Sequence, residues 1–196
     1  QAMTQATISV ETLGENAFEK CSSLASLTIN TTVKTIGASA FFDCSNGTFT
    51  TISIPDSVTM IEKGAFQSCS ALETVSGIPT ITAIPEDLFK GCTKLSELSL
   101  FTDQSRINQF TSIGAGAFTD CSSLYIPTLD LSATTIGELS NNTFKNCDLS
   151  NIILPTTITA LGVDCLRTTH KLNSVTFQEE TGTMDTSMTY LRSVNT

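Results

Sequence analysis

The chain repeats a short apolar pattern along its whole length. A phenylalanine is followed three residues later by a cysteine, and successive phenylalanines of this pattern lie 23 to 29 residues apart. Self-similarity with this period is typical of a solenoid, in which each repeat forms one coil and buries its apolar face against the next coil. Six copies are complete and a seventh has leucine and threonine in the two positions: Phe18/Cys21, Phe41/Cys44, Phe66/Cys69, Phe89/Cys92, Phe118/Cys121, Phe144/Cys147 and Leu166/Thr169.

An apolar pair with a spacing of three residues precedes each phenylalanine. After this pair come glycine or a polar residue and then, directly before the phenylalanine, a small residue. Because Glu62 and Pro85 share the glycine position, we expect ordinary negative φ angles there and close packing as the reason for glycine. The pairs are Val10/Leu13, Val33/Ile36, Val58/Ile61, Ile81/Ile84, Phe110/Ile113, Ala133/Ile136 and Ile158/Leu161.

A strand is predicted after each cysteine. The pattern there is Leu-x-x-Leu-x-Leu, and its last two apolar residues alternate with polar ones, which is the period of a half-buried strand. Stacked in parallel, such strands predict a solenoid of about seven coils over residues 1–177. Residues 178–196 fit either a C-terminal cap or the start of a further repeat. Loop insertions are predicted at Ser45–Thr48, Thr102–Gln109, Tyr125–Thr128 and Glu138–Asn142.

Charge and hydrophobicity narrow the possible partners. Acidic residues outnumber basic ones 19 to 10, and the net charge is −9. This balance disfavours nucleic acid and anionic membrane surfaces, because both bind clustered lysine and arginine. No apolar run reaches the roughly 20 residues that span a bilayer, so no membrane insertion is expected. No signal peptide is recognisable, and we interpret the sequence as a mature chain or an excised fragment.

The cysteines are predicted to be free. Seven cysteines cannot all pair with one another, and six of them occupy the same position of the repeat. Neighbouring coils would hold these residues about 5 Å apart with parallel Cα–Cβ vectors, which does not suit a disulfide. We therefore expect buried thiols that pack as small apolar side chains. A zinc site needs about four clustered ligands, so neither a metal nor a cofactor is expected.

The repeat resembles the BspA-type leucine-rich repeat. The pattern Ile-Gly-x-x-Ala-Phe-x-x-Cys-x-x-Leu-x-x-Leu-x-Ile-Pro is matched almost completely between Ser53 and Leu72, and its copies extend over most of the chain. The resemblance implies a curved α/β leucine-rich repeat solenoid, mostly short parallel strands joined by short helical or 3-10 turns. It also implies a secreted or cell-surface location, since some members are similar to adhesins that bind host or microbial proteins. The motif is structural and implies no catalytic residues.

Polar residues that alternate with the buried strand residues form the candidate binding surface. Most of them carry hydroxyl groups, with Glu97 and Asp130 as acids and Phe101 and Tyr125 as aromatic anchors at strand ends. Hydroxyls and acids can hydrogen-bond a protein or a glycan, but threonine also suits any solvated strand surface. The candidates are Thr51, Ser53, Thr74, Ser76, Glu97, Ser99, Phe101, Tyr125, Thr128 and Asp130.

No catalytic centre is predicted, so the chain is not expected to be an enzyme. The single histidine, His170, lies five residues after Cys165, but that cysteine occupies the buried small position, and a Cys–His pair needs a third, orienting group. Two interpretations of function remain. The first is an extracellular or cell-surface binding module, a monomeric solenoid that adheres to a protein or glycan. The second is a structural spacer that projects another domain and has no ligand of its own.

Overall fold

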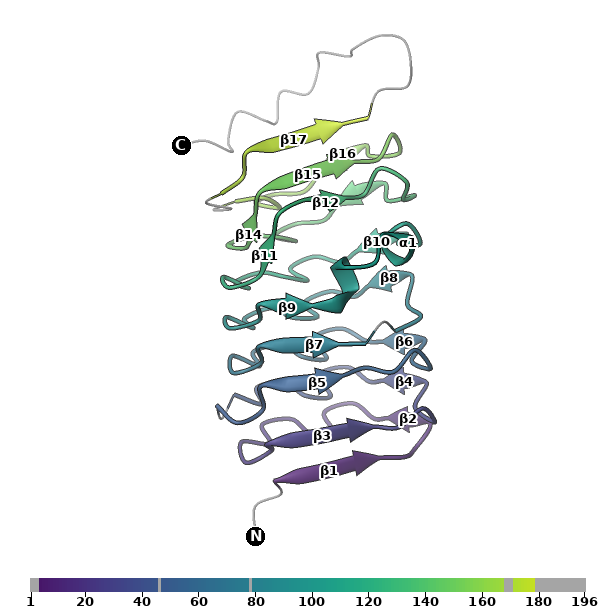
Figure 1. The fold of residues 1–196 in the computed structure, drawn as a ribbon, viewed down its shortest axis with the longest axis vertical. Helices are drawn as coiled ribbons and strands as arrows, with labels where there is room; N and C mark the ends of the chain where they lie inside the picture. Colours follow the sequence, from purple (N-terminus) through teal and green to yellow (C-terminus); the bar gives the residue numbers. More distant parts are fainter. Residues whose placement is uncertain (1–3, 46, 78, 168–170, 179–196) are drawn as a thin grey trace.

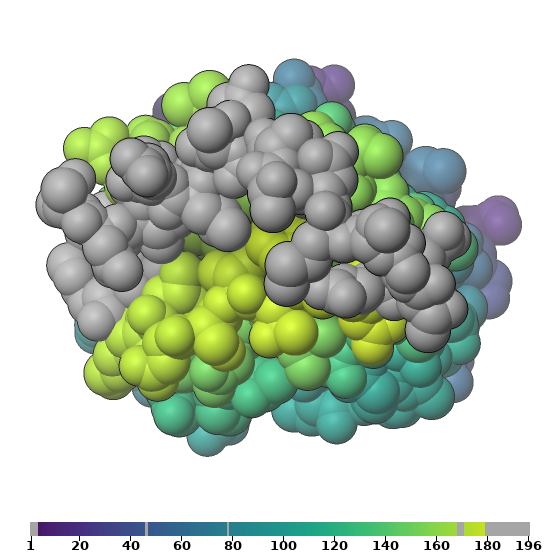
Figure 2. Space-filling view, turned by 90° about the horizontal axis from the view of Figure 1, so that it is seen from above, coloured from purple at the N-terminus to yellow at the C-terminus, as the bar shows by residue number. Residues whose placement is uncertain are grey.

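The chain winds into a stack of about seven coils. The computed structural model describes residues 4–45, 47–77, 79–167 and 171–178. Successive coils contribute strands of two to four residues to a front row and strands of two residues to a back row, and the coils follow one another in chain order (Figure 1). Figure 2 looks down the stack from its C-terminal end, where the last strand lies over the earlier coils. The predicted solenoid of parallel strands is therefore confirmed.

The front strands occupy the predicted Leu-x-Leu positions. Exposed and buried residues alternate along them, as in Ser26–Ile29, where Leu27 and Ile29 are buried, because every second side chain of a strand points to the same face. The front row consists of β1 (Gln5–Ile8), β3 (Ser26–Ile29), β5 (Thr51–Ser53), β7 (Thr74–Ser76), β9 (Glu97–Leu98), β12 (Leu129–Asp130), β15 (Asn151–Leu154) and β17 (Ser174–Phe177). Hydrogen bonds join them in three groups, β1-β3, β5-β7-β9 and β12-β15-β17.

The back row was not predicted as strands. Each back strand has two residues: the first is exposed or half-buried, and the second is the later member of an apolar pair and points into the core. Two residues are too few to show an alternating pattern in the sequence. The strands are β2 (Thr12–Leu13), β4 (Thr35–Ile36), β6 (Met60–Ile61), β8 (Ala83–Ile84), β10 (Ser112–Ile113), β13 (Glu138–Leu139) and β16 (Ala160–Leu161).

The segments that lead from the back strands to the cysteines are successive tight turns rather than helices. Two residues of each of the first six turn segments have positive φ, one before the small position and one before the cysteine, as at Asn16 and Lys20. Asn, Asp and Gly accept this conformation most readily. The amide of Phe18, between these two positions, donates to the carbonyl of Ala40 in the next coil at 2.7 Å. The other positions are Ser39, Asp43, Gly64, Ser68, Asp87, Gly91, Gly116, Asp120, Asn142, Asn146 and Asp164.

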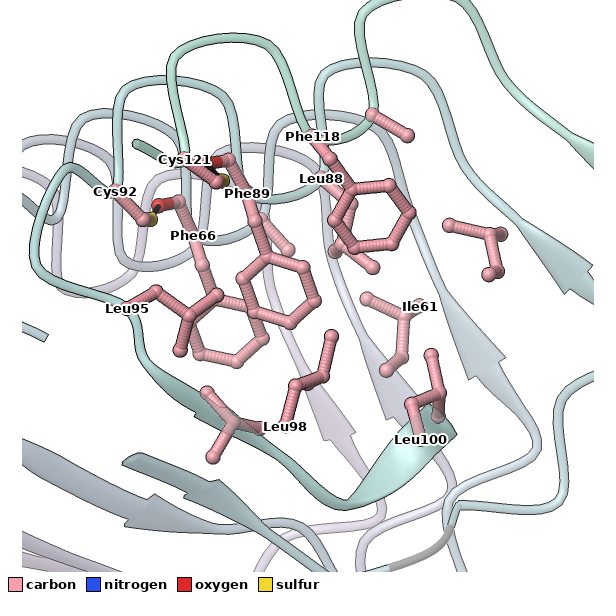
Figure 3. Packing of buried hydrophobic residues seen from close by; sticks show 14 of the residues in the cluster. Ile61, Phe66, Leu88, Phe89, Cys92, Leu95, Leu98, Leu100, Phe118 and Cys121 are labelled. Carbon is pink, nitrogen blue, oxygen red and sulfur yellow. Dashed lines mark hydrogen bonds between the residues drawn. The ribbon is translucent and has the colours of Figure 1, made fainter. Parts of the chain in front are cut away.

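A ladder of phenylalanine rings runs through the core. Six rings, one from each complete copy of the repeat, stack with centroids 5.1 to 5.9 Å apart and planes within 23° of parallel. Figure 3 shows Phe66, Phe89 and Phe118 one behind another, with Leu88 and Leu98 packed beside the rings. Side chains of this size dominate the burial that stabilises the coil-to-coil contact. The assignment of the phenylalanine position to the core is confirmed.

The cysteines form a second ladder beside the rings. All seven thiols are free, and all except Cys21 are buried. Each cysteine from Cys44 to Cys147 donates its S–H to a phenylalanine carbonyl of the preceding coil, with Sγ–O distances of 2.8 to 3.1 Å. The expectation of free, buried thiols is confirmed for six cysteines, whereas Cys21 is free but half-buried. The sequence pattern did not show these hydrogen bonds, which distinguish cysteine from alanine in this position because alanine has no donor.

Thiol reactivity gives a first test. Burial raises the pKa of Cys92 and Cys147 from the ordinary value of 9.0 to about 12, because an apolar interior disfavours the thiolate. In the native protein at pH 8 we expect Ellman's reagent to modify Cys21 first and to leave the buried thiols unmodified. All seven cysteines should react after denaturation. Two or three internal disulfides in a mass spectrum of the native protein would contradict this expectation.

The same pKa values give the pH dependence of stability a definite sign. The buried thiols of Cys92 and Cys147 titrate higher in the folded chain than in the unfolded chain. Between pH 9 and 12 the folded state therefore binds more protons than the unfolded state, and stability falls as pH rises. The stability that these two buried, protonated thiols contribute is complete below pH 9 and is lost as the pH rises toward 12. Urea midpoints at pH 8 and pH 10.5 should show the decrease, and replacing one buried cysteine with serine should make the decrease smaller.

Two parts of the predicted register are wrong. In the sixth coil, β13 pairs with β16 and aligns Leu139 with Leu161, so the apolar pair is Ile136/Leu139 rather than Ala133/Ile136. Glu138–Asn142 is therefore partly strand. In the fifth coil, β11 (Tyr125–Ile126) pairs with β14 (Asp148–Leu149), and the supposed insertion Tyr125–Thr128 places Ile126 in the core. Both errors arise because the copies of the repeat differ in length. A copy that has lost some of the pattern residues can then be aligned to the repeat pattern in more than one way.

Two short helices lie at the predicted insertion Thr102–Gln109, the first directly before it and the second within it. These are η1, a 3-10 helix at Ser99–Phe101, and α1 at Gln104–Ile107. Asp103 caps the start of α1, since its carboxylate accepts a hydrogen bond from the Ser105 amide at 2.9 Å. Ile107 is buried and attaches the insertion to the core. The predicted cap or further repeat, residues 178–196, lies outside the described residues except for Gln178.

Candidate binding face

Five of the predicted site residues lie together on the strands β5, β7 and β9. We call Thr51, Ser53, Thr74, Ser76 and Glu97 the hydroxyl face. The strand register places Thr51 opposite Thr74, Ser53 opposite Ser76, and Thr74 opposite Glu97. Thr51, Ser53 and Glu97 are exposed, and the other two are half-buried. The structure therefore brings these five side chains onto one rigid surface, as the alternation along the strands predicted.

Two hydroxyls of this face already have partners in the protein. The hydroxyl of Thr74 donates to a carboxylate oxygen of Glu97 at 3.4 Å, and that of Ser76 donates to the Ile52 carbonyl at 3.4 Å. The hydroxyls of Thr51 and Ser53 make no hydrogen bond to any part of the chain that the structure describes. An incoming polar group can therefore bind Thr51, Ser53 and the Glu97 carboxylate without first breaking a strong internal contact.

The predicted face ends at Ser99, and Phe101 does not belong to it. Ser99 lies in η1 instead of continuing β9, and it is half-buried. The ring of Phe101 packs against Phe118 and Phe144, with centroids 5.2 and 6.4 Å apart. This corrects the interpretation of Phe101 as an outward anchor. An aromatic residue directly after a strand can turn inward when the chain bends into a helix, and no pattern in the sequence indicated η1.

Tyr125 is an exposed aromatic residue but lies apart from the hydroxyl face. It lies on β11, with 53% of its surface exposed, opposite Asp148 of β14. Lys171 of the next coil places its ammonium 5.2 Å from the centre of the tyrosine ring and 2.5 Å from an oxygen of Asp148. The other oxygen of Asp148 is buried without a hydrogen-bond partner in the described structure. Tyr125 is thus held in a small cluster with one cation and one carboxylate.

Asp148 and Lys171 were missed by the sequence analysis. Their signal was a constant spacing of 23 residues from Tyr125 to Asp148 and from Asp148 to Lys171, which places all three in one column of adjacent coils. Opposite charges one coil apart can be recognised by that spacing. This column lies before the Leu-x-Leu segment, and Tyr125 was the one predicted site residue in it.

Thr128 and Asp130 belong to the fifth coil, beyond the insertion. Thr128 is exposed, whereas Asp130 on β12 is half-buried. The carboxylate of Asp130 accepts a hydrogen bond from the Ser132 amide at 2.9 Å, and its carbonyl accepts one from the Gln104 side chain at 2.8 Å. Asp130 therefore alternates with the buried Leu129 and Leu131 as predicted, but it is half-buried and its carboxylate already has a partner within the protein. The Asp130 carboxylate stabilises a turn, and the Asp130 carbonyl is bound by Gln104 of α1 in the insertion.

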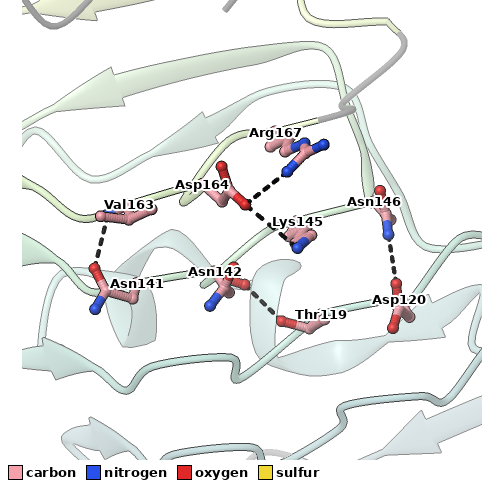
Figure 4. Close-up of polar contacts among 9 residues, drawn as sticks. All are labelled: Thr119, Asp120, Asn141, Asn142, Lys145, Asn146, Val163, Asp164 and Arg167. Atoms are coloured by element: carbon pink, nitrogen blue, oxygen red, sulfur yellow. Dashed lines mark hydrogen bonds and ion pairs between the residues drawn. The ribbon is translucent and has the colours of Figure 1, made fainter. Parts of the chain in front are cut away.

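Polar contacts also join the last coils along the turn segments. Asp164 accepts from Lys145 at 3.3 Å and from Arg167 at 3.0 Å (Figure 4). These contacts, first that with Arg167 and then that with Lys145, lower the pKa of the Asp164 carboxyl. In the described part of the chain, no group of three or more His, Cys, Asp or Glu side chains is placed to hold a metal ion. His170 lies outside the described residues, so the rejected Cys–His pair is not tested.

With the geometry established, comparison with known proteins identifies the family. The model of the BspA-type leucine-rich repeat region matches residues 2–109 and 102–195 in six copies. The chain therefore belongs to the BspA-type leucine-rich repeat family. The search of curated proteins returned no match.

Solved structures of bacterial leucine-rich repeat proteins share the fold. A leucine-rich repeat protein of Treponema pallidum has 24% identity and a TM-score of 0.69 over 86% of this chain and 78% of its own. One from Eubacterium ventriosum has 27% identity and a TM-score of 0.67 over 90% of this chain and 44% of its own. A leucine-rich cell surface protein of Faecalibacterium prausnitzii has 23% identity and a TM-score of 0.50, with coverage of 89% and 60%. The chain thus spans less than half of the Eubacterium structure.

Among the described residues, no helix is long and apolar enough to cross a membrane.

Proposed function

We propose that this repeat domain is an extracellular or cell-surface binding module that adheres to a protein or glycan through the hydroxyl face. The observation that carries the proposal is the register of β5, β7 and β9, which fixes five polar side chains on three hydrogen-bonded strands. Groups held on rigid strands lose little conformational entropy when a ligand binds. A structural relative described as a leucine-rich cell surface protein supports the location.

The composition of the face suggests weak binding at a single site. Large aromatic anchors carry much of the energy in tight interfaces, but Phe101 is packed against the core and Tyr125 lies in a separate cluster. Hydroxyls and one carboxylate give directional hydrogen bonds, each contributing about 0.5–1.5 kcal/mol. Useful affinity on a cell surface would then come from many repeats or many molecules acting together.

The test begins with a binding screen of the folded domain against matrix proteins and mucin glycans. For a ligand that binds, the double substitution Thr51→Arg with Glu97→Arg should lower the affinity at least tenfold, because both side chains are exposed on the hydroxyl face. Surface plasmon resonance measures the change, and circular dichroism confirms that the variant is folded.

A matched control carries the same two charges on the back row. Met60→Arg with Glu138→Arg replaces two exposed first residues of back strands and changes the net charge by the same amount as the test variant, since each pair replaces one neutral and one acidic residue. It should leave the affinity within about twofold, because the hydroxyl face is untouched. Equal losses in both variants would indicate a general charge effect. Unchanged binding by both would place the contact at the α1 insertion or favour the spacer interpretation.

A further inference from the structure

An aromatic ring and a carboxylate lie next to each other on the paired strands β11 and β14. The two strands are neighbours in the stack (Figure 1), and their register aligns Tyr125 with Asp148. Tyr125 is exposed, and 20% of the Asp148 side chain is exposed. A cation at this place is attracted both by the charge of the carboxylate and by the face of the ring. Because strand pairing fixes both backbones, the pair is in position before any cation arrives.

Lys171 of the next coil occupies this place in the structure. Its ammonium lies over the Tyr125 ring, 5.2 Å from the centroid, and 2.5 Å from Oδ2 of Asp148. The described residues provide no further partner for this ammonium, and 61% of the lysine side chain is exposed. An exposed ion pair and an exposed cation–π contact are both weak, because water and the entropy of a long side chain compete with them. Lys171 can therefore leave while Tyr125 and Asp148 stay where they are.

The lysine satisfies only one oxygen of the Asp148 carboxylate. Oδ2 accepts from the ammonium, whereas Oδ1 is buried and has no hydrogen-bond partner among the described residues. A buried acceptor without a donor is costly. A guanidinium carries two parallel N–H donors in a fixed fork that matches both oxygens of a carboxylate, and it also stacks on aromatic faces. An arginine therefore suits Tyr125 and Asp148 better than the lysine that lies there.

A second lysine lies over a ring but lacks the unpaired acceptor. The Lys20 ammonium is 5.8 Å from the centroid of Phe42 and 3.1 Å from the carboxylate of Glu19, the residue before it in the chain. Among the buried side-chain nitrogen and oxygen atoms of the described residues, Oδ1 of Asp148 is the one without a hydrogen-bond partner. The combination of a ring, a carboxylate and an unused acceptor therefore distinguishes the site at Tyr125 from an ordinary surface ion pair.

We propose that Tyr125 and Asp148 form a binding site for an arginine side chain of a partner protein, with Lys171 as its internal competitor. In the bound state the guanidinium lies on the Tyr125 ring and donates to both oxygens of Asp148, and the Lys171 ammonium moves into solvent. The net charge of −9 favours the approach of a basic partner. The site shares no residue with the hydroxyl face, so it does not depend on the function proposed for that face.

The experiment titrates the folded protein with the peptide acetyl-Gly-Arg-Gly-amide and follows the backbone amide signals of Tyr125 and Asp148 by NMR. Lys171→Ala should bind this peptide at least fivefold more tightly than the parent protein, because an apparent affinity is reduced by the fraction of molecules in which the site is already filled. Lys90→Ala is the matched control, since it removes a lysine from another ion pair, that with Asp87 at 3.2 Å. Its affinity should stay within about twofold of the parent value.

Two further substitutions, each made in the Lys171→Ala protein, test the contacts. Asp148→Asn keeps the shape of the side chain but removes its charge and should lower the affinity at least tenfold, and Tyr125→Leu should lower it at least threefold. Circular dichroism confirms that each variant is folded.

A lysine peptide tests the choice of arginine. Acetyl-Gly-Lys-Gly-amide should bind the Lys171→Ala protein at least fivefold more weakly than the arginine peptide does, because an ammonium lacks the forked pair of donors. Equal binding of the two peptides would overturn the assignment to arginine. Binding that survives Asp148→Asn, or an affinity of Lys171→Ala no higher than that of Lys90→Ala, would overturn the site itself, and so would the absence of detectable binding.

Discussion

Replacing Phe66 with alanine is expected to lower the free energy of unfolding by about 3–5 kcal/mol, through lost burial and the cavity left behind. The side chain is fully buried, and its ring stacks on Phe41 at 5.1 Å and on Phe89 at 5.4 Å. The backbone cannot close over the gap, because the Phe66 amide is tied to the Leu88 carbonyl of the next coil at 3.0 Å. The cavity therefore persists in the folded state.

The measurement is urea denaturation followed by circular dichroism, with Phe42→Ala as the matched control. Phe42 is adjacent to the ladder residue Phe41 but is only half-buried, and its ring lies under the Lys20 ammonium at 5.8 Å. We expect the Phe42→Ala substitution to cost about 1 kcal/mol or less, since a partly exposed ring loses little burial. Equal decreases in the free energy of unfolding for Phe66→Ala and Phe42→Ala would show that the phenylalanine position was wrongly assigned to the core.

The repeat could be predicted from the sequence because its signal is redundant. Each of the phenylalanine and cysteine positions is confirmed by five others at nearly constant spacing, so a single degraded copy does not obscure the ladder. The ordinary φ angle at the glycine position was also predictable, because Pro85 occupies it in one copy and proline permits only negative φ. None of the glycines in that position has a positive φ in the structure.

The candidate face was only partly predictable, since it depends on where the regular repeat stops. Alternation along a strand correctly placed Thr51 and Ser53 outward. It failed at Phe101, because the chain leaves β9 for η1 and the alternation no longer decides which side chain is buried. At Asp130 the alternation held, but it did not show that the Ser132 amide binds the carboxylate or that Gln104 of the insertion binds the carbonyl. Repeats can be recognised from sequence, whereas the structure of an irregular insertion depends on tertiary contacts that one sequence does not show.

Gly77 is the residue at which the repeat pattern and the backbone geometry disagree most sharply. It occupies the third apolar position of its coil, where the neighbouring coils have Ile54 and Leu100, and a small apolar cavity of about 10 Å³ borders it, lined in part by Val75 and Leu98. The repeat pattern alone predicts that a larger apolar residue would fill this space and stabilise the fold. The backbone predicts the opposite, because Gly77 has a φ of +86° and a Cβ atom there would lie 2.0 Å from the Ile54 carbonyl oxygen.

We expect Gly77→Ala to lower the free energy of unfolding by about 2–4 kcal/mol, the sum of a strained φ and a backbone clash. The strand pairing is also affected, since the Ile54 amide donates to the adjacent Ser76 carbonyl at 2.9 Å. Gly47→Ala is the control, because Gly47 also has a positive φ, +69°, but a Cβ there meets nothing within 4 Å. That variant should lose only about 1 kcal/mol from the conformational term. Equal losses in urea denaturation would mean that φ alone requires glycine at position 77, and a gain for Gly77→Ala would restore the interpretation of position 77 as an apolar core position.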